Sequence, residues 1–144
     1  MKSNSYRNLL AYQEFLSDIP WDYMCVFSTD YSLSENSARR LMERLHARLK
    51  KMAYANADGL MLFWIAEKFK AKDGYHLHAL IKEPPSLKLI TEYEINLAFQ
   101  IVSGARKKGK CFRTDIKKYN PKLNGARYCA KDLIHYSTSY DFII

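Results

Sequence analysis

Two histidines separated by one residue, His76 and His78, are the side chains in this sequence best suited to bind a metal ion. They lie in a stretch from Tyr75 to Lys82 that is typical of a β-strand and follows a turn signal. Because alternate residues of a strand point to the same face, both imidazoles project together, and Leu77 and Ala79 point to the opposite, core-facing side. Two imidazoles on one face can hold a divalent cation. A pair of ordinary solvent-exposed histidines is the alternative.

A carboxylate on the preceding strand would complete such a metal site. The apolar run from Leu60 to Phe69 predicts that strand, and Asp73-Gly74 joins it to the histidine strand as a β-hairpin. With the turn near Lys72-Asp73, Glu67 lies roughly across from His78. Two histidines and a carboxylate suit magnesium or manganese with a phosphate oxygen as a further ligand. We therefore expect Glu67 and both histidines to bind Mn²⁺ or Mg²⁺.

A tyrosine near the C-terminus is a candidate nucleophile. A final helix is predicted over about Ala126 to Tyr136, and in it Tyr128 and Lys131 are three residues apart and share a face. A tyrosine hydroxyl, with an ordinary pKa of about 10, is a weak nucleophile at neutral pH. A metal-polarised phosphate with a lysine beside it overcomes this weakness. The alternative is an amphipathic helix with Tyr128 half-buried and Lys131 solvated.

The excess positive charge of the chain is confined to one stretch, from Gly104 to Lys131. This stretch has ten basic residues and one acid, a net charge of +9, whereas the rest of the chain carries −1. Phe112, Tyr119 and Tyr128 are interleaved with the charges, which favours a partner with phosphates and stackable bases. A solvated basic face is the alternative. The basic residues expected to contact single-stranded DNA are Arg106, Lys107, Lys108, Lys110, Arg113, Lys117, Lys118, Lys122 and Arg127.

The elements that must position these residues follow from hydrophobic periodicity and turn signals. Helices are predicted over Ser5–Ser17, Ser34–Ala53, Thr91–Ser103 and Ala126–Tyr136, and strands over Trp21–Ser28, Leu60–Phe69, Tyr75–Lys82 and Cys111–Ile116. The middle of this order is β-α-β-β-α-β, a ferredoxin-like split β-α-β plan that folds as one antiparallel sheet with helices packed on one face. Residues 1–144 are expected to form a single α+β domain with additional N- and C-terminal helices.

Composition limits the class of protein further. No apolar run approaches the length of a membrane span, and the N-terminus has no apolar segment of the signal-peptide type. We therefore expect a soluble protein of the host-cell cytoplasm with no membrane partner. The three cysteines, Cys25, Cys111 and Cys129, are widely spaced and form no Cys-x-x-Cys pair. This spacing favours reduced thiols over a disulfide framework or a zinc site.

Taken together and in this order, the motifs resemble those of the HUH superfamily. The resemblance is to its single-tyrosine rolling-circle replication initiators, endonucleases of plasmids, phages and single-stranded DNA viruses. It extends over roughly Trp21 to Tyr136. The motifs are Val26-Phe27-Ser28-Thr29 in the first strand, His76-Leu77-His78 in the metal-binding strand and Tyr128-Cys129-Ala130-Lys131 in the last helix.

The resemblance implies a DNA endonuclease and strand transferase. His76, His78 and Glu67 would bind the metal that polarises the scissile phosphate of single-stranded DNA or of an origin hairpin. Tyr128 would attack the phosphorus, leaving a 5′-phosphotyrosine link and a free 3′-hydroxyl, and Lys131 would orient the phosphate and offset its charge. A later 3′-hydroxyl would attack the link and rejoin the strand. The expected partners are a host or viral polymerase and a helicase, since this chain has no helicase domain.

Two positions of the last helix limit the comparison with other initiators. Asp132 stands where a second tyrosine of a paired-tyrosine enzyme would be expected, so the sequence predicts a single-tyrosine enzyme. Tyr136 is either a second nucleophile or a packing residue. A single-tyrosine transposase with the same metal motif is one alternative function, although such enzymes usually carry glutamine in place of Lys131. A non-catalytic nucleic-acid-binding module on a ferredoxin-like sheet is an alternative of another class.

Overall fold

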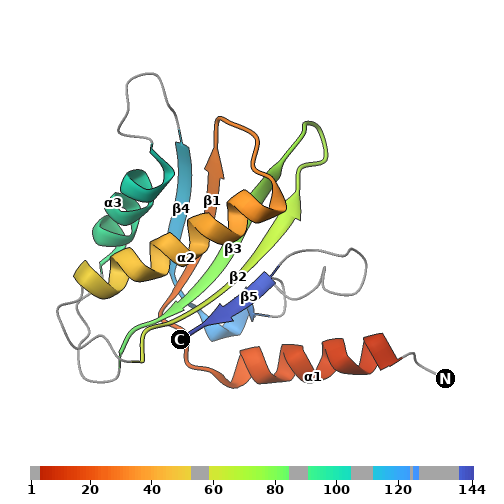
Figure 1. Ribbon diagram of the computed structural model, residues 1–144. Coiled ribbons are helices and arrows are strands. Elements are labelled where there is room, and N and C mark those ends of the chain that lie inside the picture. Colours follow the sequence, from red (N-terminus) through yellow and green to blue (C-terminus); the bar gives the residue numbers. More distant parts are fainter. Residues whose placement is uncertain (1–3, 53–58, 85–90, 105–111, 124, 127–139) are drawn as a thin grey trace.

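The protein is an α+β structure built on one antiparallel sheet of five strands in the order β4-β1-β3-β2-β5 (Figure 1). The computed structural model describes residues 4–52, 59–84, 91–104, 112–123, 125–126 and 140–144, with the backbone alone for 4–9 and 112. The elements are α1 (Asn4–Asp18), β1 (Tyr23–Thr29), α2 (Glu35–Met52), β2 (Met61–Lys68), β3 (Tyr75–Lys82), α3 (Glu92–Ser103), β4 (Phe112–Lys118), the 3-10 helix η1 (Pro121–Leu123) and β5 (Tyr140–Ile143). Among these residues, no helix combines the length and apolar character that crossing a membrane requires.

The central four strands have the predicted split β-α-β topology. β1 and β2 each pair antiparallel with β3, so they run parallel to each other with β3 inserted between them, and α2 connects them. In the same way, β3 and β4 each pair antiparallel with β1, and α3 connects them. The two interleaved units confirm the β-α-β-β-α-β plan expected from the sequence.

The main core lies between the sheet and the helices α2 and α3, which cover one face, here called the helix-covered face (Figure 1). Strand β1 alternates between buried and half-buried residues, as a strand with one face in the core does. Phe27 of β1 stacks on Phe99 of α3, with ring centroids 4.4 Å apart. Leu77 and Ala79 of β3 are fully buried in the same core, which confirms the side predicted for them.

Local hydrogen bonds cap the start of α2 and both ends of α3. Thr91 is the N-cap of α3, and its hydroxyl accepts a hydrogen bond from the backbone N–H of Glu94 at 3.2 Å. Gly104 ends α3 in the left-handed conformation at φ 77°, where a side chain would be strained. The hydroxyl of Ser34 accepts from the N–H of Ser37 at the start of α2. Local capping therefore sets where α2 begins and where α3 begins and ends.

The opposite face of the sheet, here called the second face, carries Phe63, Ile65 and Leu80. Helix α1 packs on part of it through Leu16, and the indole N–H of Trp21 donates to the Leu16 carbonyl oxygen at 2.8 Å. The expectation that the helices of the β-α-β-β-α-β core pack on one face is thus confirmed by α2 and α3, whereas the additional N-terminal helix α1 packs on the other face. The reason is that α1 precedes the split β-α-β units and is not one of their crossovers.

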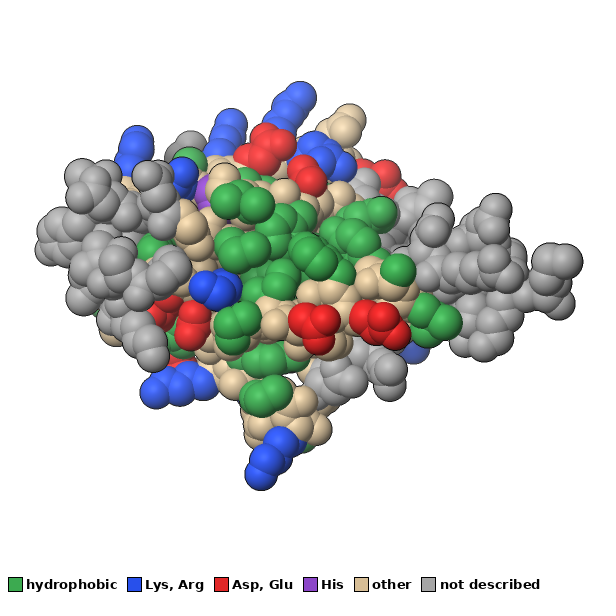
Figure 2. Space-filling view, turned by 90° about the horizontal axis from the view of Figure 1, so that it is seen from below, with side chains coloured by type: hydrophobic (Ala, Val, Ile, Leu, Met, Phe, Trp, Pro, Cys, Tyr) green, Lys and Arg blue, Asp and Glu red, His purple; other side chains and the backbone are tan. Residues whose placement is uncertain are grey.

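Aromatic side chains join α1 to the C-terminal strand. The ring of Tyr12 in α1 lies 5.6 Å from that of Tyr140 in β5, and the ring of Phe15 lies 5.8 Å from that of Phe142. Phe15 and Tyr140 remain 51% and 42% exposed, so this contact is only partly closed. Hydrophobic side chains accordingly gather at the centre of the molecule when it is seen from the side on which α1 lies (Figure 2).

Strand β5 is an element that the sequence reasoning missed. It pairs antiparallel with β2, with Tyr140 opposite Ile65 and Ile143 opposite Leu62. Its Asp141 accepts a hydrogen bond from Arg39 at 3.0 Å, which links β5 to α2. Of the final helix predicted over Ala126–Tyr136, residues 127–136 lie outside the described residues.

Candidate metal centre

The β2–β3 hairpin determines which residues face each other at the predicted metal site. Glu67 lies directly opposite His76, and Ile65 lies opposite His78. The predicted pairing of Glu67 with His78 is therefore wrong by two residues. Because the side-chain period of a strand is two, this change keeps Glu67 on the same face as both histidines. His78 becomes its diagonal neighbour, still within reach of a long side chain.

The position of the hairpin turn explains the difference. The backbone N–H of Phe69 donates to the carbonyl oxygen of Gly74 at 3.1 Å, so the loop consists of residues 70–73. The sequence reasoning centred the turn on Lys72-Asp73, one residue further along the chain. A turn centre moved by one residue moves every strand partner by two.

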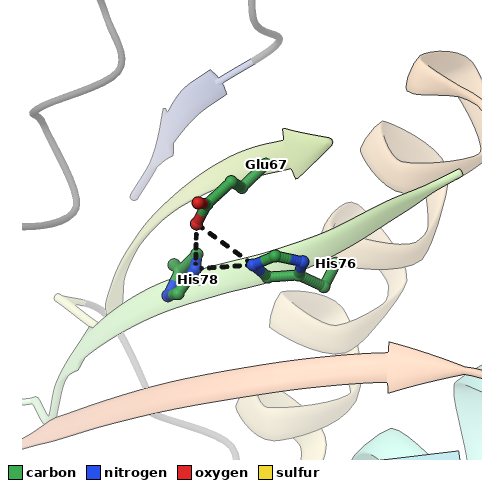
Figure 3. Close-up of polar contacts among 3 residues, drawn as sticks. All are labelled: Glu67, His76 and His78. Carbon is green, nitrogen blue, oxygen red and sulfur yellow. Dashed lines mark hydrogen bonds and ion pairs between the residues drawn. The ribbon is translucent and has the colours of Figure 1, made fainter. Parts of the chain in front are cut away.

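The three predicted ligands converge on one point (Figure 3). The Oε2 atom of Glu67 lies 2.6 Å from Nε2 of His78 and 3.1 Å from Nε2 of His76, and the two nitrogens are 3.0 Å apart. Adjacent ligands of an octahedral ion bound at about 2.1 Å are separated by about 3.0 Å. The spacing therefore fits three neighbouring positions around one divalent cation, as in a facial arrangement of two histidines and a carboxylate.

Hydrogen bonding alone does not account for this cluster. Each imidazole Nε2 either carries a proton and donates or lacks one and accepts, and an ionised carboxylate only accepts. If both histidines donate to Glu67, two N–H groups face each other across the 3.0 Å contact. If His76 instead donates to His78, two acceptors face each other across the 2.6 Å contact between His78 and Glu67. A cation bound by three lone pairs removes this conflict.

The charge state of Glu67 agrees with a role as a ligand. Burial, the largest single influence, raises the pKa of Glu67, but the positive charges and hydrogen bonds of His78 and His76 together lower it further, so the pKa lies below its ordinary value. The side chains of Glu67 and His76 are 20% and 21% exposed, whereas that of His78 is 7% exposed. The site is thus an ionised carboxylate and the imidazole of His76, both partly accessible from solvent, beside the buried imidazole of His78.

Among the described residues, packing and not a hydrogen bond holds the Nδ1 side of His76, the more exposed of the two histidines. Metal-bound histidines usually donate their second N–H to a carboxylate or carbonyl group. Within the part of the chain that the structure describes, the buried Nδ1 of His76 has no such partner. Its ring instead lies against Phe69, with centroids 4.9 Å apart. Sequence reasoning missed Phe69, although its position two residues after Glu67 places it on the same face.

The predicted nucleophile and its neighbours cannot be placed relative to this site. Tyr128, Lys131 and the alternative tyrosine, Tyr136, lie outside the described residues. The same holds for five of the residues predicted to contact DNA, namely Arg106, Lys107, Lys108, Lys110 and Arg127. Their roles stay predictions from the sequence.

The basic residues of β4 divide between the two faces of the sheet. Arg113 pairs with Ser28 and Lys117 with Met24, on the side of β1 that also bears Val26, the partner of His78. Directly paired residues share a face, so Arg113 and Lys117 lie on the second face with the histidines, about two strand spacings, or roughly 10 Å, away.

The other described charges of the basic stretch from Gly104 to Lys131 do not add to this positive surface on β4. Lys118 pairs with Tyr23, a residue of the core under the helix-covered face, so it lies on the other side of β4. Asp115 lies between the two basic residues of the second face and approaches Lys117 at 3.5 Å. Lys122 is exposed in η1. Part of the predicted basic surface thus flanks the metal centre, and its net charge is reduced by one acid.

The described residues bring together the three predicted metal ligands and place two predicted DNA contacts on the same face. A group of one glutamate and two histidines with this spacing could hold a divalent metal ion. This geometry alone is shared by several classes of metalloprotein. No protein-family model, curated protein or solved structure matches this chain.

Proposed function

We propose that this protein is a metal-dependent endonuclease that nicks and rejoins single-stranded DNA through a covalent link to Tyr128. The single observation that carries the proposal is the convergence of Glu67, His76 and His78, whose ligand atoms lie 2.6 to 3.1 Å apart on one face of the sheet. A bound Mn²⁺ or Mg²⁺ would polarise a phosphate at that point. The resemblance in motif order to single-tyrosine replication initiators supports the choice of a phosphodiester as substrate.

The chain offers groups for the rest of the substrate on the same face. Arg113 and Lys117 are exposed there, two strand spacings, or roughly 10 Å, across the sheet from the histidines. Their role in the proposal is to hold phosphates that flank the scissile one. Such contacts release counterions, so affinity for DNA falls steeply with salt.

The proposed reaction is a transesterification. The hydroxyl oxygen of Tyr128 forms a bond to phosphorus, the bond from phosphorus to the 3′-oxygen breaks, and the phenolic proton is transferred in net terms to that oxygen. The products are a 5′-phosphotyrosine and a free 3′-hydroxyl that a polymerase can extend. Lys131, one turn further along the predicted helix, offsets charge on the phosphate. Attack by a later 3′-hydroxyl reverses the step and releases the tyrosine.

The biological context within this proposal is the initiation of rolling-circle replication. Lys131 in place of glutamine favours an initiator over a single-tyrosine transposase. Strand separation would come from a separate helicase or from an extruded origin hairpin. A non-catalytic binding module would explain the basic stretch but gives no reason for a carboxylate and two histidines to converge.

The test is formation of a covalent protein–DNA adduct. Purified protein is incubated with labelled single-stranded oligonucleotides from its own replicon, with Mn²⁺ or with a chelator, and analysed on a denaturing gel. We expect a slower-migrating labelled species only with the metal. Tyr128→Phe should abolish it, whereas Tyr136→Phe, the matched control on the same predicted helix, should retain it.

The outcomes separate the parts of the proposal. An adduct that persists in Tyr128→Phe and disappears in Tyr136→Phe would show that the nucleophile is wrong. An adduct that resists chelation would show that the metal centre is not used. Binding on a native gel without any adduct, across all oligonucleotides of the replicon, would favour the non-catalytic module.

A further inference from the structure

The loop of the β2–β3 hairpin places a lysine beside the metal centre. The ammonium nitrogen of Lys72 lies 4.3 Å from the centroid of the Phe69 ring, and that centroid lies 4.9 Å from the centroid of the His76 ring. These two distances limit the separation between the ammonium group and the centre of the His76 ring to at most about 9 Å. Lys72 is otherwise exposed to solvent.

The loop that carries Lys72 has a defined conformation. Its ends are joined by the hydrogen bond from Phe69 N–H to the Gly74 carbonyl oxygen. Gly74 has φ +95°, and a Cβ atom at this position would lie 2.7 Å from the hydroxyl oxygen of Ser32. A glycine is therefore needed both for the turn and for close packing against the loop that precedes α2. This packing fixes the base of the loop on which Lys72 is presented.

The contact between Lys72 and Phe69 holds the cation without neutralising it. A ring face attracts an ammonium group but accepts no proton and carries no net charge. The ammonium group of Lys72 therefore remains available to an anionic ligand. The neighbouring loop charges are Lys70 and Asp73, and both are exposed. An anion bound at the metal centre would have the Lys72 ammonium within about 9 Å of the His76 ring.

We propose that Lys72 is a phosphate-binding residue of the metal centre. A phosphodiester held at Glu67, His76 and His78 would be bound on its other side by the Lys72 ammonium, which Phe69 keeps in place. This inference rests on the proposed function for its substrate class, a single-stranded nucleic acid. The phosphate would then be contacted by two lysines, Lys131 on the predicted C-terminal helix and Lys72 on the hairpin loop.

The experiment measures binding of a fluorescent single-stranded oligonucleotide by anisotropy, with Mn²⁺ and with a chelator. Lys72→Met is compared with Lys70→Met, which removes an equal charge from the same loop. We expect Mn²⁺ to increase the affinity of the wild-type protein, and Lys72→Met to lose about tenfold of that increase, as for one charge-assisted hydrogen bond. Lys70→Met should keep it, and both variants should bind Mn²⁺ itself as the wild type does.

A double-mutant cycle separates phosphate binding from a merely structural role of Lys72. In a Phe69→Leu background, we expect Lys72→Met to lose less metal-dependent affinity than in the wild type, because the lysine is no longer held beside the site. Circular dichroism and urea unfolding check that each variant folds.

The outcomes distinguish this inference from the proposed function. If Lys72→Met and Lys70→Met lose equal affinity, or if the effect of Lys72→Met is the same without metal, Lys72 does not bind phosphate at the metal centre. If the metal-dependent effect is present but no covalent adduct forms with any oligonucleotide, the inference stands and the nuclease proposal fails.

Discussion

The two faces of strand β3 have opposite compositions although they share one backbone. On the helix-covered face, Leu77, Ala79 and Ile81 are fully buried beneath α2 and α3. On the second face, His76 and His78 alternate with them and converge with a carboxylate. The difference shows how a sheet can support chemistry: one set of side chains fixes the strand in place, and the other set is left to bind a ligand.

The division also explains how the candidate metal centre can be assembled from strand residues alone. Glu67 lies between Ala66 and the exposed Lys68 at the end of β2, and Ala66 is fully buried on the helix-covered face. Burial of the apolar rows of β2 and β3 therefore fixes the backbone positions of all three ligands. Sites built on strands hold their geometry more tightly than sites built on loops.

The largest expected effect comes from a substitution in the core under the helix-covered face. Leu77→Ala should lower the free energy of unfolding by about 2 to 5 kcal/mol, because it removes buried methyl groups and leaves a cavity. His76→Ala, the neighbouring residue on the second face, should change it by about 1 kcal/mol or less in metal-free buffer. Urea unfolding followed by circular dichroism measures both values. Equal losses in the two variants would mean that the two faces do not divide stability and binding in this way.

A second prediction concerns His46, a buried histidine of α2. Nε2–H of His46 in α2 donates to the carbonyl oxygen of Leu60 at 2.9 Å. Burial, opposed by this hydrogen bond and assisted by Lys50, lowers the pKa of His46 below its ordinary 6.5. The unfolded chain therefore binds a proton more readily than the folded protein as the pH falls through 6.5.

It follows that His46 destabilises the fold on acidification. The free energy of unfolding should fall below pH 6.5, by at most about 1.4 kcal/mol per pH unit for this one proton. His46→Gln keeps an N–H donor and removes the titration, so its stability should depend less on pH between 7 and 5. Glu67, whose pKa is lowered, contributes only at more acidic pH. Identical pH profiles for the wild type and His46→Gln would contradict the prediction.

The smallest expected effect concerns the basic residues on the two faces of β4. Arg113→Gln and Lys117→Gln, on the second face, should each reduce the slope of log affinity against log salt for a single-stranded oligonucleotide by about 0.7. Lys118→Gln, on the helix-covered side of the same strand, should leave the slope unchanged. Anisotropy titrations between low and moderate salt measure the three slopes. Equal changes in all three variants would mean that DNA binding does not follow the faces of the sheet.

Much of the fold could be predicted from the sequence because its signals are local. The strand at Tyr75–Lys82 was predicted with the bounds that the structure has, and the ends of α3 follow from Thr91 and Gly104. The convergence of the three candidate metal ligands followed from the alternation of side chains along two adjacent strands. The face on which a strand residue lies depends only on parity, so it survived an error of two residues in the hairpin register.

The parts of the fold that were not predicted depend on contacts between residues far apart in the sequence. Strand β5 has only four residues, Tyr140–Ile143, and is fixed by pairing with β2, far away in the sequence. The side of the sheet on which α1 packs depends on Leu16 and Trp21 meeting Phe63 and Leu80, which no local pattern specifies. The stack that positions Lys72 depends on where the hairpin turn closes, and this is where the predicted register was wrong.

The most direct test of the metal centre is the binding of Mn²⁺ itself, measured by titration calorimetry and by the paramagnetic resonance signal of the free ion. We expect one ion per wild-type chain, released by a chelator. Glu67→Gln, which keeps the shape of the side chain and removes its charge, should weaken binding at least about 100-fold, since even indirect supports of a metal site contribute 10- to 100-fold. Glu43→Gln, an exposed position on α2, should bind as the wild type does. Equal affinity in the two variants, or no binding to the wild type, would contradict the assignment of this site to a metal ion.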